Sequence, residues 1–257
     1  MKHVIFKVPN DPRLKLYHGV LVRKDRTDDQ HMVAECDHAY SHFQYLQGDA
    51  VLDLGVNVGG FAVMALPHDI RKYIGVEPDP ENMSIAKINV NGCCHSDRAE
   101  LFLGAASVST EKTLTFYQTE SGNAKCSGTV TPKSRRALAA RPIQYRVKNY
   151  SIDELILLNS TEIVKMDIEG AEWDWFRKNS GCLPGIIREF AVDLHHASDI
   201  AWFDKTILPV MLKSFDLVHA EANTAYEGKK ELTYSFPGLG LSGTDDVYAV
   251  DAFFRRK

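Results

Sequence analysis

Residues 51–61, VLDLGVNVGGF, decide how the rest of the chain is arranged. An apolar run that contains Asp53 leads into a turn, and a helix-forming segment follows. The turn contains Gly55, Asn57, Gly59 and Gly60. Glycine and asparagine tolerate positive φ angles, and glycine lets a ligand approach the backbone. Open α/β sheets bind ligands at the carboxyl ends of their strands, so this strand, turn and helix predict a site for a nucleotide-like cofactor.

A second predicted strand, 72–76 (KYIGV), ends at Glu77. An acid about twenty residues after a glycine loop can accept hydrogen bonds from both hydroxyls of a ribose. The dinucleotide fingerprint Gly-x-Gly-x-x-Gly is incomplete, because Asn57 replaces its middle glycine. The pattern therefore disfavours NAD and an oxidoreductase, although both cofactor classes place an acid at Glu77.

The composition is that of an ordinary globular protein with one domain and appendages. The chain has 257 residues, of which 44% are hydrophobic and 25% charged, and its net charge of −4 argues against binding of the whole molecule to nucleic acid. Its five cysteines form no Cys-x-x-Cys pair, which fits a reducing cytoplasm. No apolar run approaches the roughly 18 residues that a membrane span needs, so we expect a cytoplasmic protein.

Later segments continue the α/β pattern. Strands are predicted at 100–103, 162–166, 186–194, 215–220 and 246–253, and helices at 80–91 and 203–213. The strand at 162–166 brings Asp167 to the same edge of the sheet as Asp53 and Glu77. The strand at 186–194 ends before His195 and His196. Small residues at Ala105 and Ala106 leave room for a flat ring such as adenine, and a plain turn is the alternative.

Three motifs carry a family resemblance. They are Asp53-Leu-Gly-Val-Asn-Val-Gly-Gly, Val76-Glu-Pro-Asp-Pro and Lys165-Met-Asp-Ile-Glu-Gly-Ala-Glu. Together they resemble the FkbM-type class I S-adenosylmethionine-dependent methyltransferases, including the asparagine at position 57. The resemblance implies a Rossmann-like, mostly parallel seven-stranded sheet with helices on both faces and an antiparallel final pair of strands. It also implies methyl transfer to a hydroxyl of a sugar, glycan or natural product.

In this interpretation the glycine loop holds the amino-acid end of S-adenosylmethionine. Asp53 anchors that end, and Glu77 binds the ribose hydroxyls. The predicted cofactor-binding residues are Asp53, Gly55, Asn57, Gly59, Glu77, Pro78, Ala105 and Ala106.

The predicted catalytic residues follow the fourth and fifth strands. A sulfonium already favours loss of its methyl group, so positioning of the acceptor and one general base suffice. His195 or His196 is the predicted base, because imidazole accepts a proton near neutral pH, and Asp167 is the predicted orienting acid. Alternatively, Asp167, Asp193 and His195 bind Mg or Mn, which lowers the pKa of a sugar diol.

Residues 1–48 are predicted to form a hairpin and a helix that cover the cofactor or the acceptor side, ahead of a methyltransferase domain at 49–257. The hairpin strands are expected at 4–8 and 19–23, and the helix at 28–46. Within that helix His38 and His42 share one face, a spacing that a metal can use. No acid stands at motif spacing beside them, so we favour an ordinary surface or core pair.

An insertion at about 112–150 interrupts the α/β units. Strands are predicted at 113–117 and 143–147, and residues 133–148 hold six basic side chains and no acid. We favour a solvated loop for this basic segment. The alternative is a lid that binds an acceptor with a phosphate or carboxylate group.

Two other functions stay open on the sequence: an RNA ribose O-methyltransferase and a non-catalytic scaffold with a cofactor fold. The chain lacks the Asn/Asp-Pro-Pro-aromatic motif of amino-methylating enzymes. The expected partner is a small-molecule or glycan substrate, without nucleic acid or membrane. The sequence also allows a homo-oligomer or a module of a longer chain.

Overall fold

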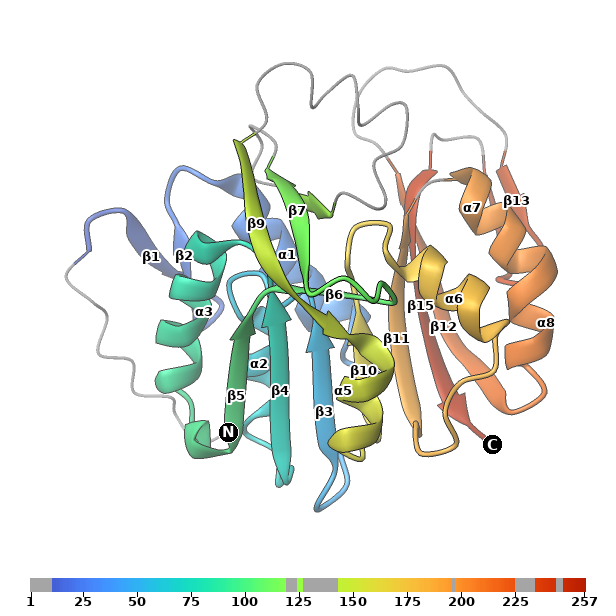
Figure 1. Cartoon of the computed structure of the whole chain (residues 1–257), viewed down its shortest axis with the longest axis horizontal. Coiled ribbons are helices and arrows are strands. Elements are labelled where there is room, and N and C mark those ends of the chain that lie inside the picture. The colour runs from blue at the N-terminus through green and yellow to red at the C-terminus, as the bar shows by residue number, and fades with distance from the viewer. Residues whose placement is uncertain (1–10, 119–123, 127–142, 196, 225–233, 244–246) are drawn as a thin grey trace.

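The computed structural model describes residues 11–118, 124–126, 143–195, 197–224, 234–243 and 247–257. A seven-stranded sheet in the order β12-β15-β11-β10-β3-β4-β5 crosses the molecule (Figure 1). Its strands are Ala50–Leu54 (β3), Lys72–Glu77 (β4), Ala99–Leu103 (β5), Ile163–Met166 (β10), Glu189–His195 (β11), Phe215–Thr224 (β12) and Val247–Arg256 (β15). Only β15 runs antiparallel to its neighbours in this sheet. This confirms the predicted mostly parallel sheet and its antiparallel final pair.

Helices cover both faces of the sheet (Figure 1). One face carries Thr27–Ala39 (α1), Gly60–Ala65 (α2) and Pro80–Asn91 (α3). The other carries Ile152–Leu158 (α5), Glu172–Asn179 (α6), Ala197–Trp202 (α7), the π-helix Phe203–Ile207 (η2) and Leu208–Met211 (α8). Successive strand residues alternate between these layers: Val51 packs with the first group and Leu52 with the second. Both faces are therefore buried, and the strands read as continuous apolar runs.

Two helix starts follow from local capping chemistry. Asp79 accepts hydrogen bonds from the backbone N–H groups of Glu81 and Asn82, and Pro80 occupies the first turn of α3. Ser151 caps α5 by accepting from the N–H of Glu154. A short 3₁₀ turn, Ser96–Arg98 (η1), precedes β5. The helix predicted at 80–91 is confirmed.

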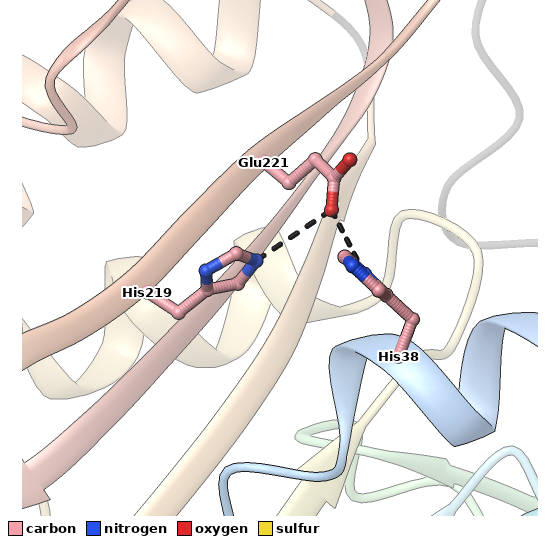
Figure 2. A group of neighbouring side chains, drawn as sticks. All are labelled: His38, His219 and Glu221. Atoms are coloured by element: carbon pink, nitrogen blue, oxygen red, sulfur yellow. Dashed lines mark ion pairs between the residues drawn. The ribbon is translucent and has the colours of Figure 1, made fainter.

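The N-terminal elements differ from the predicted ones. The hairpin consists of Leu14–Tyr17 (β1) and Val20–Arg23 (β2), while residues 4–8 lie outside the described part. Helix α1 ends at Ala39 instead of continuing to residue 46. The chain turns there because Tyr40 and Phe43 are buried against Phe61 and Phe253 of the core. At its last turn, His38 lies beside Glu221 of β12 (Figure 2).

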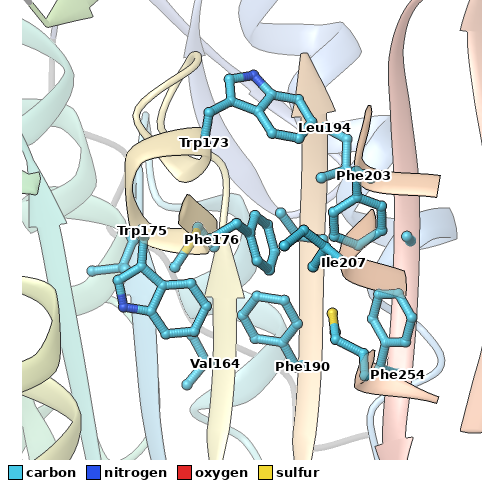
Figure 3. Packing of buried hydrophobic residues seen from close by; sticks show 14 of the residues in the cluster. Val164, Trp173, Trp175, Phe176, Phe190, Leu194, Phe203, Ile207 and Phe254 are labelled. Atoms are coloured by element: carbon cyan, nitrogen blue, oxygen red, sulfur yellow. The ribbon is translucent and has the colours of Figure 1, made fainter. Parts of the chain in front are cut away.

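Aromatic rings fill the core between the sheet and the second group of helices (Figure 3). Phe176 packs edge to face on Phe203 with ring centroids 4.9 Å apart, and Trp175 stacks on Phe190 at 5.8 Å. These rings come from α6, η2 and β11. They fix α6, and with it the loop that follows Asp167, against the sheet.

The insertion forms a separate four-stranded sheet in the order β6-β9-β7-β8. Its strands are Ala105–Ser107 (β6), Thr113–Gln118 (β7), Ala124–Cys126 (β8) and Ile143–Ser151 (β9). The two predicted strands are confirmed. Of the six basic residues, Lys133, Arg135, Arg136 and Arg141 lie outside the described residues.

The remaining elements lie near the C-terminal end. Tyr234–Phe236 (β13) and Leu241–Gly243 (β14) form a two-stranded sheet. The helix predicted at 203–213 is divided into η2 and α8, and the fifth strand starts at Glu189, three residues later than its predicted start. Among the helices that the structure describes, none combines the length and the apolar character that crossing a membrane requires.

Candidate active site

A pocket lies at the carboxyl ends of β3, β4 and β10, as the glycine loop predicts. Its space, including the open mouth, is about 650 Å³. Its lining residues are Met32, Gly55, Asn57, Val76, Glu77, Pro78, Asn82, Ala105, Ala106, Phe116, Asp167, Ile168 and Glu169. Six of the eight predicted cofactor residues and the predicted catalytic Asp167 are thus brought together. Asp53 and Gly59 are not among the lining residues.

The loop between β3 and α2 uses left-handed backbone. Gly55, Asn57 and Gly59 have φ angles of 89°, 52° and 92°. A Cβ atom on Gly55 would lie 1.9 Å from the carbonyl oxygen of Asp167, so only glycine fits there. A Cβ on Gly59 would lie 3.2 Å from Cα of Ala86 in α3. Gly55 therefore brings the loop against the strand end of Asp167, and Gly59 lets the loop pack on a helix.

Glu77 is held rigidly at the pocket wall. Its Oε2 accepts a hydrogen bond of 2.8 Å from the N–H of Asn57, and its Oε1 accepts one of 2.9 Å from the N–H of Asp79. The Asn82 amide contacts Oε1 at 3.4 Å. Burial raises the pKa of Glu77 to about 7, although these hydrogen bonds work in the opposite direction. A carboxylate offers about four lone-pair sites, so it retains acceptor capacity toward the pocket.

Asp53 is fully buried behind the loop. Its carboxylate accepts a hydrogen bond from the Tyr73 hydroxyl, and its Oδ1 lies 3.3 Å from Nζ of Lys165. The same Nζ lies 3.4 Å from Oδ2 of Asp167 and donates to the Gly55 carbonyl at 2.5 Å. Burial alone lowers the pKa of Lys165, but the Asp53 and Asp167 carboxylates outweigh it and raise that pKa above its ordinary value. Lys165 therefore links Asp53 to the loop and to Asp167.

His195 lies among carboxylates at the end of β11. Its Nδ1 is 3.0 Å from Oε1 of Glu172, and its Nε2 is 3.2 Å from Oδ2 of Asp193 and 3.6 Å from Oε2 of Glu169. Burial alone lowers the pKa of His195, but the three carboxylates raise it well above its ordinary value. The three carboxylates therefore favour the protonated form of the ring. His196, the other predicted base, lies outside the described residues.

Asp193 belongs to two groups of side chains whose oxygen or nitrogen atoms could bind a metal ion. Oxygen or nitrogen atoms of Asp167, Asp193 and His195 lie within 4.8 Å of one another, and so do carboxylate oxygens of Glu35, Asp193 and Asp251. The predicted metal set is thus one contiguous group. Burial, together with Asp251 and Asp167, raises the pKa of Glu35 to about 8.

Comparison with known proteins decides the family. Residues 53–211 match the family described as the methyltransferase FkbM domain, which is more than half of the chain. The chain belongs to the FkbM methyltransferase family. No curated protein matches this FkbM methyltransferase.

The chain is similar to three solved structures. Trm5b from Pyrococcus abyssi is 9% identical with a TM-score of 0.51, over 95% of this chain and 55% of its own. The C-terminal domain of precorrin-6Y C5,15-methyltransferase from Rhodobacter capsulatus is 12% identical with a TM-score of 0.42. The match covers 89% of this chain and 90% of that domain. TrmK from M. capricolum, solved with S-adenosylhomocysteine, is 8% identical with a TM-score of 0.42. The match covers 87% of this chain and 68% of the TrmK chain. At 9% identity the likeness to Trm5b concerns the fold alone.

Three charged residues of this FkbM methyltransferase were not assigned a role from the sequence. Lys165 stands in the quoted third motif, and a cation inside the otherwise apolar strand IVKM was a usable signal for a buried partner. Asp251 likewise interrupts the apolar run of β15. Glu35 gives no comparable signal, because acids on helices such as α1 are common. Only tertiary structure brings it to Asp193.

Proposed function

We propose that this chain is an S-adenosylmethionine-dependent O-methyltransferase that acts on a hydroxyl group of a sugar, glycan or natural product. The observation that supports it is the arrangement of a single pocket. Glu77 and Asn57 line one part of it, and Asp167, which adjoins Asp193 and His195, lines another. The nucleoside site thus lies beside Asp193 and His195, which do not line the pocket themselves but adjoin it through Asp167.

The lining residues fit the cofactor chemically. The Glu77 carboxylate is oriented by two backbone N–H groups and can accept hydrogen bonds from ribose hydroxyls. Ala105 and Ala106 are buried and small, which leaves space for a purine ring. When bound, S-adenosylmethionine supplies a methyl group activated by its sulfonium. We assign Asp53 a positioning role, because it acts on the loop through Lys165.

A hydroxyl acceptor must lose its proton as the methyl group is transferred. The surrounding carboxylates favour the protonated form of His195, which is the form that cannot accept a proton. We assign proton uptake to the His195–Asp193 pair, with Oδ1 of Asp193 as the accepting atom. That oxygen is buried and has no hydrogen-bond partner among the described residues. Burial raises the pKa of Asp193, which makes it a stronger base than an exposed carboxylate.

The same three side chains support a second mechanism, in which Mg or Mn bound by Asp167, Asp193 and His195 lowers the pKa of the acceptor hydroxyl. Its supporting observation is that the ligand atoms lie within 4.8 Å of one another. Metal binding requires His195 to lose its proton, so the two mechanisms exclude each other. Turnover after chelator treatment, with and without added Mg or Mn, separates them.

The test measures release of S-adenosylhomocysteine with glycans, small alcohols and RNA as acceptors. We expect Asp193→Asn to bind S-adenosylhomocysteine as the wild type does and to lose about 10²- to 10⁴-fold in turnover, the usual contribution of a general base. The control is His31→Ala, an exposed histidine on α1. Full turnover in Asp193→Asn refutes the assigned base, and turnover on RNA alone refutes the acceptor class.

A further inference from the structure

A second cluster of ligating side chains lies outside the pocket. It consists of His38 from the last turn of α1 and of His219 and Glu221 from β12, and we call it the histidine cluster (Figure 2). Oε2 of Glu221 lies 3.1 Å from Nδ1 of His38 and 3.6 Å from Nε2 of His219. None of the three residues lines the cofactor pocket.

A β-bulge turns the two strand residues toward α1. Leu217 pairs with Phe254, and the register then shifts, so that His219 pairs with Phe253 and Glu221 with Asp251. In a regular strand residues 217, 219 and 221 would share one face. The extra residue of the bulge moves His219 and Glu221 to the opposite face from Leu217, which packs with the other core layer.

The neighbouring ring supports this arrangement. His42 stacks on His219 with ring centroids 4.5 Å apart, and it also packs near Phe253 at 5.8 Å. These contacts restrict the rotation of the His219 ring. Its Nε2 is buried and makes no hydrogen bond to any described residue, since its distance to Glu221 exceeds hydrogen-bond length.

The distances fit a shared ion. Zinc binds imidazole nitrogen and carboxylate oxygen at about 2.0–2.2 Å in tetrahedral sites, so two ligand atoms of such a site lie roughly 3.4 Å apart. The observed separations of 3.1 and 3.6 Å lie on either side of that value. Two imidazoles and one carboxylate also select zinc over magnesium, which prefers an all-oxygen shell.

We propose that His38, His219 and Glu221 form a zinc site that joins the end of α1 to strand β12. The fourth position is open to water. Because α1 also carries Met32 at the cofactor pocket, the ion would hold the helix that covers this pocket against the sheet. The proposal is independent of the methyl-transfer chemistry.

The test uses the full chain after chelator treatment. Zinc is titrated by isothermal calorimetry, and Co²⁺ is added as a spectroscopic substitute whose visible absorption reports tetrahedral nitrogen and oxygen coordination. We expect one zinc site in the wild type and a rise in melting temperature when zinc is added. His219→Ala and Glu221→Gln should lose both effects, and the control His31→Ala should retain them.

A second variant distinguishes the histidine cluster from the acidic group near the pocket. Asp193→Asn removes a ligand only from the acidic group, so zinc binding should persist in it. Zinc binding that is lost in Asp193→Asn but retained in His219→Ala overturns the proposal. Unchanged zinc binding in both cluster variants overturns it as well. Glu221 is half-exposed, so Glu221→Gln is expected to fold, and circular dichroism checks this.

Discussion

The Nζ atom of Lys165 lies 3.3 Å from Oδ1 of Asp53, and both side chains are buried between the sheet and α1. The two residues are register partners on adjacent parallel strands. Lys165 also donates to the carbonyl of Gly55 and pairs with Asp167. A single ammonium group therefore fixes the glycine loop relative to the end of β10. The loop and this strand end form two walls of the cofactor pocket.

Removal of that ammonium should destabilise the protein strongly. Lys165→Met leaves the Asp53 carboxylate buried without a cation, and we expect a loss of about 3–5 kcal/mol in the free energy of unfolding. The matched control is Lys178→Met, because Lys178 pairs with Asp153 at 2.6 Å on the surface. Exposed pairs contribute about 0–1 kcal/mol. Urea denaturation measures both variants, and equal losses would contradict the role of Lys165.

Cofactor affinity should depend on pH through Glu77. Burial raises the pKa of Glu77 to about 7, so this group favours the folded state at low pH, and that contribution is lost as the pH rises through about 7. Cofactor binding depends on pH in the opposite direction and strengthens as the pH rises, because the ionised carboxylate is the better acceptor for ribose hydroxyls. We expect affinity for S-adenosylhomocysteine to fall by up to about tenfold per pH unit below the pKa. Calorimetry on Glu77→Gln should show no such slope, and an identical slope in the variant would rule Glu77 out.

Two glycines with similar backbone angles should respond differently to substitution. Gly55 and Gly48 have φ angles of 89° and 86°, but a Cβ on Gly55 meets the Asp167 carbonyl at 1.9 Å while one on Gly48 meets nothing within 4 Å. Gly48→Ala should cost only the left-handed strain, about 1–2 kcal/mol. Gly55→Ala should cost more and also abolish S-adenosylhomocysteine binding. Thermal unfolding and calorimetry check this, and equal effects of the two substitutions would refute it.

The aromatic core should be sensitive at Phe176. This ring is fully buried and packs on Phe190 and Phe203, so Phe176→Ala leaves a cavity and should lower stability by about 3–5 kcal/mol. Leu158 at the end of α5 is 82% exposed, and Leu158→Ala is the control with a change near zero. Denaturant midpoints measure both. A loss at Phe176 no larger than at Leu158 would show that this cluster does not anchor α6.

Much of the site was predictable because its residues directly follow strands that can be recognised along the chain. Gly55, Asn57, Glu77 and Asp167 each stand at the end of a strand, and parallel strands bring their carboxyl ends to one edge. Asp53 was assigned to the cofactor on the same logic. Its side chain instead lies beside that of Lys165 on the neighbouring strand, because Asp53 lies within β3, one residue before the end of the strand.

The charge state of His195 was not predictable. The sequence places an imidazole at the strand end, where a neutral ring would serve as a base. The structure adds Glu169 from the turn after β10, Glu172 from the first turn of α6 and Asp193 from the strand of His195 itself. Three acidic side chains around one buried ring favour its protonated form, and their convergence depends on how the turn packs against β11.

The sequence by itself determined the strand segments of the sheet, the cofactor loop and the acids at the strand ends, because apolar runs, glycine positions and chain order are properties of the sequence alone. Tertiary structure alone decided which charges meet. Lys165 meets Asp53 on the adjacent strand, and a bulge in β12 turns His219 and Glu221 toward His38. A register shift of one residue reverses the face of every later side chain in a strand, and alternation in the sequence does not reveal where such a shift occurs.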